Sequence, residues 1–189
     1  MKHLQHIKSF LFTIIILVGF TSCTKDDIDS DKKLSGITVK LKSVFGEMDN
    51  LYIEIEDVQL NMKQNSDASD NWISLNAINT GTHNAFDFKE GSELLLVEDF
   101  AVESNYIYEI RLVLGHNNFI DVNDALHSLD VTTLGNPTPS NLVKTKLITN
   151  RFYDFVIDID IDKSISYSED ENMMVLNPNI YTEIRQIEY

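Results

Sequence analysis

Apolar and polar residues alternate along most of the chain beyond residue 34, and this alternation restricts the fold more than any other feature. It is clearest in residues 153–161, where the odd positions are apolar or aromatic and three of the four even positions are aspartates. Side chains two residues apart lie on the same face of a β-strand, so this segment predicts a strand with one buried face and one acidic face.

Similar runs predict further strands, and turn-forming residues separate them. The runs are residues 37–41, 51–60, 72–75, 85–88, 94–97, 106–114, 119–122, 144–148 and 174–187. The alternation changes phase near Asp57, which indicates a β-bulge. Pro178 interrupts the last run and implies an edge or a bulge there. Residues 162–168 could form one short turn. No long segment has helical periodicity, so we expect a single all-β domain over residues 34–189, an antiparallel sandwich.

The N-terminus has the layout of an export signal. Lys2 and Lys8 precede an apolar run from residue 10 to residue 20, which is too short to span a bilayer. Residues 20–23 resemble a lipobox, and Cys23 is the chain's only cysteine. We therefore expect residues 1–22 to be a lipoprotein signal peptide and Cys23 to carry acyl chains such as palmitate. The alternative is an ordinary secretory signal with a chance cysteine.

Residues 23–33 are polar, charged and suited to a flexible acidic tether. Within them Lys25, Asp26 and Asp27 resemble the signal that sends some Bacteroidota lipoproteins to the outer face of the outer membrane. The expected location is thus the outer membrane, facing the cell surface, with its periplasmic leaflet as the alternative.

The charge balance excludes one class of partner. The whole chain has a formal charge of −15, and loss of Lys2 and Lys8 with the signal peptide makes it −17. Such a chain repels phosphate backbones, so nucleic-acid binding is not expected. Neutral or cationic partners, or partners joined through metal ions, fit better.

Several segments together resemble the family known as domain of unknown function 4382. They are residues 36–41, 51–60, 108–115 with Asn117 and Asn118, 158–165 and 175–178. The resemblance extends over residues 34–187. It implies a Greek-key sandwich similar to transthyretin (prealbumin) domains, common in exported lipoproteins, and no established activity. The chain departs from the family pattern at residues 43–46, where only Gly46 of an expected Asp-Ala-Pro-Gly turn is kept.

A calcium site is the one cofactor that the acidic residues suggest. Asp158, Asp160 and Asp162 occupy the first ligand positions of an EF-hand-like loop, but Lys163 stands where that loop needs glycine. On a strand these carboxylates would also be about 7 Å apart. A solvated acidic face is the better interpretation, and a looser calcium site remains the alternative.

No catalytic set can be named from the sequence. His83, His116 and His127 lie near predicted turns without metal-ligand spacing, and no phosphate-binding loop or nucleophile elbow is present. Paired carboxylates for glycoside hydrolysis cannot be located. We therefore expect no enzyme, and a hydrolase ranks below the other functions.

The aromatic residues support a binding function instead. Trp72 and Tyr108, with other tyrosines, could form a platform on which sugar rings stack. Because Trp72 is followed by strand alternation, a place in the core is the stronger expectation for it. The leading hypothesis is a non-catalytic binding or structural module for a glycan or a partner protein. The second is a subunit of an envelope complex that docks by β-strand addition.

Overall fold

The computed structural model describes residues 33–44, 50–63, 71–88 and 91–188. Residues 33–189 form one compact unit. Cys23, Lys25, Asp26 and Asp27, with the rest of the expected signal and tether, lie outside the described residues, as does Gly46.

Most of the described chain is β-strand. The elements are β1 (Leu34–Val44), β2 (Leu51–Asn61), β3 (Trp72–Ser74), β4 (Gly81–Asn84), η2 (Ala85–Asp87), β5 (Leu94–Glu103), β6 (Tyr106–Leu114), β7 (Phe119–Val122), β8 (Ala125–Asp130), β9 (Ser140–Lys146), β10 (Phe152–Asp160), α2 (Ile161–Ser164), β11 (Ile165–Ser168), β12 (Met173–Leu176) and β13 (Asn179–Ile187).

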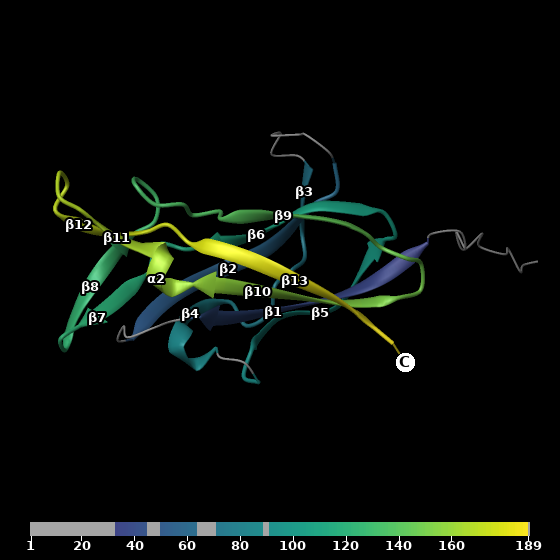
Figure 1. Ribbon diagram of the computed structural model, residues 1–189, viewed down its shortest axis with the longest axis horizontal. Helices are drawn as coiled ribbons and strands as arrows, with labels where there is room; N and C mark the ends of the chain where they lie inside the picture. Colours follow the sequence, from purple (N-terminus) through teal and green to yellow (C-terminus); the bar gives the residue numbers. More distant parts are fainter. Residues whose placement is uncertain (1–32, 45–49, 64–70, 89–90, 189) are drawn as a thin grey trace, which may run out of the picture. The chain divides into compact units, whose positions relative to one another are not determined.

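These strands form two sheets that face each other (Figure 1). The small sheet has the order β13-β10-β1-β5, and the large sheet has the order β11-β12-β8-β7-β2-β6-β9, with β3 and β4 also paired to β2. The predicted all-β sandwich is confirmed. Two pairs run parallel, β1 with β10 and β8 with β12, and all other strand pairs of the described residues are antiparallel.

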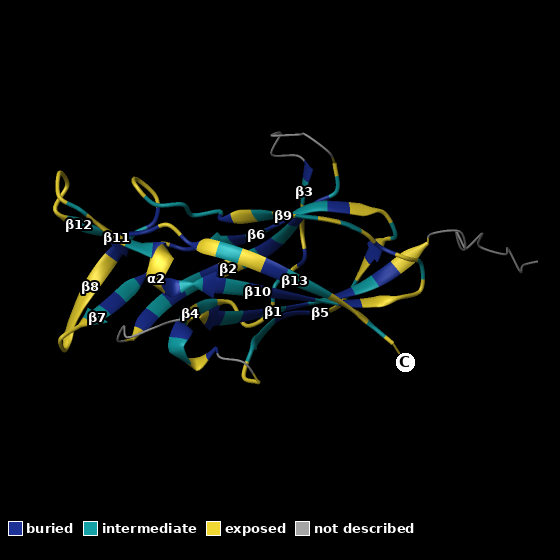
Figure 2. Cartoon of the chain, in the orientation of Figure 1, coloured by how far each residue is buried: buried dark blue, intermediate teal, exposed yellow. Residues whose placement is uncertain are grey.

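The core lies between the sheets and follows from the alternation in the sequence. On β1, Ile37, Val39 and Leu41 are fully buried, and on β10 so are Phe155 and Ile157. They form one apolar cluster with buried residues of β2 and β6 from the large sheet (Figure 2). The outer faces keep the polar residues, as strands with one solvated face require.

Each edge strand of the small sheet has a hydrogen bond to a segment outside that sheet, on one side to the loop between β3 and β4 and on the other to β9. On one side, the Ile78 backbone amide donates to the Leu96 carbonyl of β5 at 2.7 Å. On the other, the Thr182 hydroxyl of β13 donates to Asn141 Oδ1 of β9 at 2.7 Å.

Of two irregularities predicted from the sequence, the bulge near Asp57 is confirmed, whereas the edge or bulge expected at Pro178 within one strand over residues 174–187 is wrong, because two strands of different sheets form there. The register of β2 against β6 shifts between Ile55 and Asp57, which is the expected bulge. Pro178 separates β12 from β13, and the chain passes there from the large sheet to the small one. A proline can occupy this position because it lies between the two ladders and no ladder needs its missing N–H group.

Other predicted elements are wrong or incomplete. Residues 85–87 form the 3-10 helix η2 rather than a strand, because the Asn84 side chain caps it by accepting the Phe86 amide at 3.1 Å. The strand predicted at 94–97 continues to Glu103, past Asp99, whose φ of 45° breaks the alternation. The strand expected at 144–148 is Ser140–Lys146, and β4, β8 and β11 were not predicted. The short turn expected over residues 162–168 is the helical turn α2 followed by strand β11.

Candidate functional site

The outer face of the large sheet carries a cation stacked on the chain's only tryptophan. β3 pairs with β2 so that Trp72 lies opposite Asn61, and β6 pairs with β2 so that Arg111 lies opposite Gln59. The Arg111 guanidinium carbon is 4.0 Å from the centroid of the Trp72 ring, which is a close cation–π contact. Trp72 is half-buried and is not among the buried core residues, so the expectation that it belongs to the core is wrong.

A chain of hydrogen bonds fixes this arginine. Arg111 donates from Nε at 2.9 Å and from Nη2 at 2.6 Å to the Gln59 side-chain oxygen. Gln59 in turn donates to Asp57 Oδ2 at 2.9 Å, and Ser74 donates to Asp57 Oδ1 at 3.0 Å. Burial lowers the pKa of Arg111, opposed by the charges of Asp57 and Glu109, and the guanidinium stays charged at physiological pH.

Two tyrosines extend the same face along β6. The rings of Tyr106 and Tyr108 are stacked, with centroids 5.9 Å apart and an interplanar angle of 27°. Tyr106 is 43% exposed, and Leu142 on the adjacent strand β9 is 62% exposed. Trp72, Arg111, Tyr108 and Tyr106 together are called the aromatic face.

The sequence predicted two members of this face and missed the rest. Trp72 and Tyr108 were expected as ligand-binding residues, but Arg111 covers one side of the indole ring, so Tyr106 offers the more open ring. Arg111 was missed because its partners Trp72 and Gln59 lie far from it in the sequence. The sequence places Arg111 among the outward positions of a strand, which is the available signal. Only the strand pairing shows that it lies opposite Gln59.

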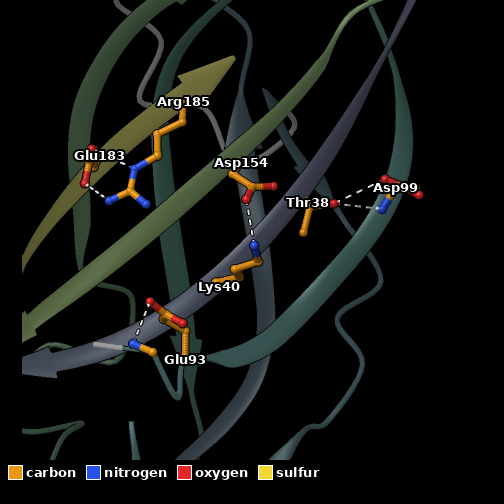
Figure 3. A network of polar contacts seen from close by, with 8 residues as sticks. Thr38, Lys40, Glu93, Asp99, Asp154, Glu183 and Arg185 are labelled. Atoms are coloured by element: carbon orange, nitrogen blue, oxygen red, sulfur yellow. Dashed lines mark hydrogen bonds and ion pairs between the residues drawn. The ribbon is translucent and has the colours of Figure 1, made fainter. Parts of the chain in front are cut away.

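The outer face of the small sheet is a set of ion pairs rather than an open acidic surface (Figure 3). Lys40 of β1 contacts Asp154 of β10 at 2.6 Å, and Arg185 contacts Glu183 within β13 at 2.6 Å. Thr38 donates to Asp99 Oδ1 at 3.3 Å. The acids of β10 point outward as the alternation predicted, and the lysines of β1 neutralise part of their charge.

The three candidate calcium ligands are engaged separately. Asp158 Oδ1 lies 3.3 Å from Lys42 Nζ, without a well-aligned hydrogen bond, and burial raises the pKa of Asp158 against the opposing effect of Lys42. Asp160 caps α2 by accepting the Lys163 amide at 3.2 Å, and the Lys163 ammonium also contacts its carboxylate. Asp162 is exposed on α2. In the described ranges no group of three or more His, Cys, Asp or Glu side chains could hold a metal ion.

Hydrogen bonds from β2 hold the connection between β6 and β7, residues 115–118, in place. Glu54 of β2 accepts the Asn117 amide at 2.9 Å and both carboxylate oxygens accept the Asn117 side chain at 3.0 Å, which lowers the pKa of Glu54. Asn118 is fully buried, accepts the Glu54 amide and donates to the Gly115 carbonyl. A Cβ on Gly115 would lie 2.0 Å from Glu54 Oε2. These residues therefore hold a turn in place and form no open site.

The three described histidines do not gather into a site. His83 contacts the Asn79 carbonyl at 2.7 Å through Nε2 and packs against Phe88, with ring centroids 5.8 Å apart. His116 and His127 are exposed. Among the described residues, no helix is long and apolar enough to cross a membrane.

The fold and its surfaces define an all-β sandwich domain with one aromatic–cationic flank and one ion-paired flank. The model of the family described as domain of unknown function (DUF4382) matches residues 37–178. The chain belongs to this family, as the resemblance predicted. The match ends at Pro178, just before β13. Neither a curated protein nor a solved structure matches the chain.

Proposed function

We propose that this protein is a lipid-anchored lipoprotein of the outer membrane and acts as a non-catalytic binding module. The support for the anchor is the order of features at the N-terminus: an apolar run too short to span a bilayer, then Cys23, then the polar residues that precede β1. An acyl anchor at Cys23 leaves the whole sandwich outside the bilayer.

The ligand-binding surface in this proposal is the aromatic face. The observation that carries it is that the stacked rings of Tyr106 and Tyr108 share the outer face of the large sheet with a tryptophan on which Arg111, held by Gln59, is stacked. Rigid aromatic rings suit the apolar faces of sugar rings, and a charged guanidinium suits their hydroxyl or carboxylate groups. A glycan is therefore the ligand class that this surface fits best.

Alanine substitutions at the tyrosines test the glycan proposal. In calorimetric titrations with neutral and uronic-acid-containing oligosaccharides, Tyr106→Ala should weaken binding by about two- to twelvefold, equivalent to about 0.5–1.5 kcal/mol for one stacked ring. Tyr181→Ala is the matched control, because Tyr181 is 65% exposed on the outer face of the other sheet. Equal losses for both variants, or no binding to any member of the panel, would contradict the proposal.

Display on the cell surface has its own test. Protease added to intact cells should cleave the domain, and replacing Lys25, Asp26 and Asp27 with alanine should remove that accessibility while leaving lipidation unchanged. A domain that stays protected until the outer membrane is opened belongs to the periplasmic leaflet instead.

One observation favours a second function, docking into an envelope complex by strand addition. Among the described strands, β5 is an edge strand paired only with β1. The Ile78 amide occupies the Leu96 carbonyl, whereas residues 100–103 line a hollow of about 250 Å³ together with Met62 and Ile73. Ile73 is 44% exposed there. An added strand would gain backbone hydrogen bonds from β5 and apolar contacts from the hollow. Mass measurement after gentle detergent extraction separates the two functions, because a subunit should bring its partner and a binding module should run alone.

A hydrolase ranks third. The family model carries no catalytic description, and the sequence locates no pair of carboxylates for glycoside hydrolysis. A screen for glycosidase and esterase activity that detects turnover would reverse this order.

A further inference from the structure

Strand β8 has a partner strand on one side and is largely without one on the other. Residues Ala125 to Ser128 all pair with β7, whereas β12 pairs only with Leu129 and Asp130. Beyond that short contact, β8 and β12 diverge towards separate hairpin tips (Figure 1). Residues 125–128 are all exposed (Figure 2). Within the described part of the chain, these four residues therefore form a free sheet edge, which is called the β8 edge.

The hydrogen bonds to the β7 side show which backbone groups of the β8 edge point outward. The Leu129 amide donates to the Asn118 carbonyl, just before β7, at 2.9 Å. Successive residues of a strand direct their backbone groups to alternate sides. His127 therefore also faces β7, whereas Leu126 and Ser128 face away from it. The Leu126 amide and carbonyl and the Ser128 amide are the groups to which an added strand can bond.

The β8 edge lacks the features that protect parts of other edges in this sandwich. Charged residues, bulges and contacts from outside the sheet commonly keep an edge from pairing. On β5 the Ile78 amide occupies the Leu96 carbonyl, and Asp99 has a φ of 45°. On β9 the charged Lys144 has a φ of 42°. Residues 125–128 contain no charged residue and no proline, and their register with β7 has no shift, so the strand itself does not oppose pairing.

A hollow with a fixed negative charge adjoins the β8 edge. It has a volume of about 260 Å³ and is lined by His116, Ser128 and Asp130 among others. Ser128 and Asp130 are two residues apart on the strand, so their side chains share one face. The Leu134 and Thr133 amides donate to Asp130 Oδ2 at 2.7 and 3.0 Å, and these hydrogen bonds lower the pKa of Asp130. The carboxylate stays ionised at neutral pH and suits a lysine or arginine side chain.

The segments around the β8 edge are acidic and carry no compensating lysine or arginine. Residues 116–136 and 165–176, which contain β7, β8, β11 and β12, include six acids and neither basic residue type. These acids are Asp121, Asp124, Asp130, Glu169, Asp170 and Glu171, and none forms an ion pair with a described residue. Asp121 lies directly opposite Leu126, on the same face of the sheet. Charge complementarity therefore favours a basic partner over a second copy of this acidic end.

We propose that the β8 edge binds an extended, lysine- or arginine-rich segment of a partner protein by strand addition. The backbone of this segment pairs with Leu126 and Ser128, and one of its basic side chains enters the hollow beside Asp130. Leu126 is 61% exposed and offers an apolar contact to the methylene groups of the neighbouring basic side chains. The inference rests on strand addition, the second function proposed above, and gives that function another edge and a partner of defined chemistry.

The test uses residues 23–189 with Cys23→Ser, which contain the whole described domain and cannot form disulfide-linked dimers. The probe is a synthetic peptide of about eight residues in which lysine alternates with threonine, long enough to extend past the β8 edge. One control peptide has glutamate in place of each lysine. A second has a methyl group on every backbone amide, which keeps the charge and removes the donors that strand addition needs. Amide hydrogen exchange, measured for each residue by NMR, locates the bound peptide.

The expected result is an alternating pattern of protection. Exchange at the Leu126 and Ser128 amides should slow at least about tenfold with saturating lysine peptide. Exchange at the His127 amide, which faces β7, should change little. Leu126→Pro should remove the slowing at Ser128, because it deletes an outward amide without deleting a hydrogen bond to β7. Urea melts check that this variant remains folded.

A charge variant tests the same edge without changing its backbone. Asp124→Lys should weaken peptide binding at least about fivefold at low salt, whereas Glu98→Lys, an equal change of charge at an exposed position of β5, should not. Equal slowing with either control peptide would overturn the inference. Slowing at residues 100–103 in place of the β8 edge would also overturn it and leave strand addition at β5 standing. Protection of the β8 edge that rises with protein concentration in the absence of peptide would overturn it in favour of a second copy.

Discussion

The orientation of β10 can be tested by placing a charge on each of its faces. Ile159 is 1% exposed and belongs to the core, whereas its neighbour Asp160 points outward and caps α2. Ile159→Asp should therefore unfold the domain, and Asp160→Asn should be nearly silent. Ile73→Asp is the matched control, because it makes the same substitution at an isoleucine that is 44% exposed.

The loss of stability expected for Ile159→Asp is the sum of two costs. Loss of a buried isoleucine side chain costs about 1.5–3 kcal/mol in transfer free energy. The new carboxyl must either stay ionised without a partner or take up a proton, and protonation at pH 7 costs about 4 kcal/mol at 1.36 kcal/mol per pH unit. The total of about 5–7 kcal/mol is comparable with the whole stability of a typical domain. Asp160→Asn keeps a capping side chain and loses one exposed ion pair, so it should cost less than about 1 kcal/mol.

Urea melts followed by circular dichroism measure these differences. Ile159→Ala is included because it should remain folded and lose about 2–5 kcal/mol, which keeps the comparison quantitative. Ile73→Asp should change stability by about 0.5 kcal/mol or less. If the two aspartate substitutions destabilise the domain equally, or if Asp160→Asn costs as much as Ile159→Ala, the register of β10 is wrong.

Three further outcomes follow from the outer faces and turns. Gly115→Ala should destabilise the domain by about 1–3 kcal/mol in urea melts, since its Cβ displaces the Glu54 carboxylate, and Glu54→Ala in the same chain should recover part of the loss. If Gly115→Ala lowers the free energy of unfolding as much in a Glu54→Ala chain as in the wild type, the contact with Glu54 is refuted. The pKa of Asp158 is raised, so the folded chain binds a proton at its carboxyl group more tightly than the unfolded chain. The wild type should therefore gain stability relative to Asp158→Asn as the pH falls through the raised pKa towards 3.8, the ordinary value. A difference that is constant with pH would contradict this. Micromolar calcium should raise the melting temperature no more than sodium chloride of equal ionic strength, and an excess removed by Asp158→Asn with Asp162→Asn would establish a site instead.

The alternation predicted the strands that form the core. β1, β2, β6 and β10 bury one face and solvate the other, so their sequences carry the period directly. β8 was missed because five of its six residues are exposed or half-buried, and only Leu129 packs into the core. A strand without a buried face leaves no period to detect.

Other features depend on contacts between distant residues. The parallel pairing of β1 with β10 joins segments more than one hundred residues apart, and either direction would bury the same side chains. Trp72 follows strand alternation, yet β3 is a three-residue edge strand and the ring packs under Arg111 instead of entering the core. The aromatic face is likewise a product of strand order, which local patterns do not encode.

The anchor at Cys23 is the central claim, and mass spectrometry of the protein purified from its own membranes tests it most directly. The account predicts that the N-terminal peptide begins at Cys23, that residues 1–22 are absent, and that the peptide carries the mass of a diacylglyceryl group with or without an amide-linked acyl chain. An N-terminal peptide that starts elsewhere, or a Cys23 with an unmodified thiol, would contradict it.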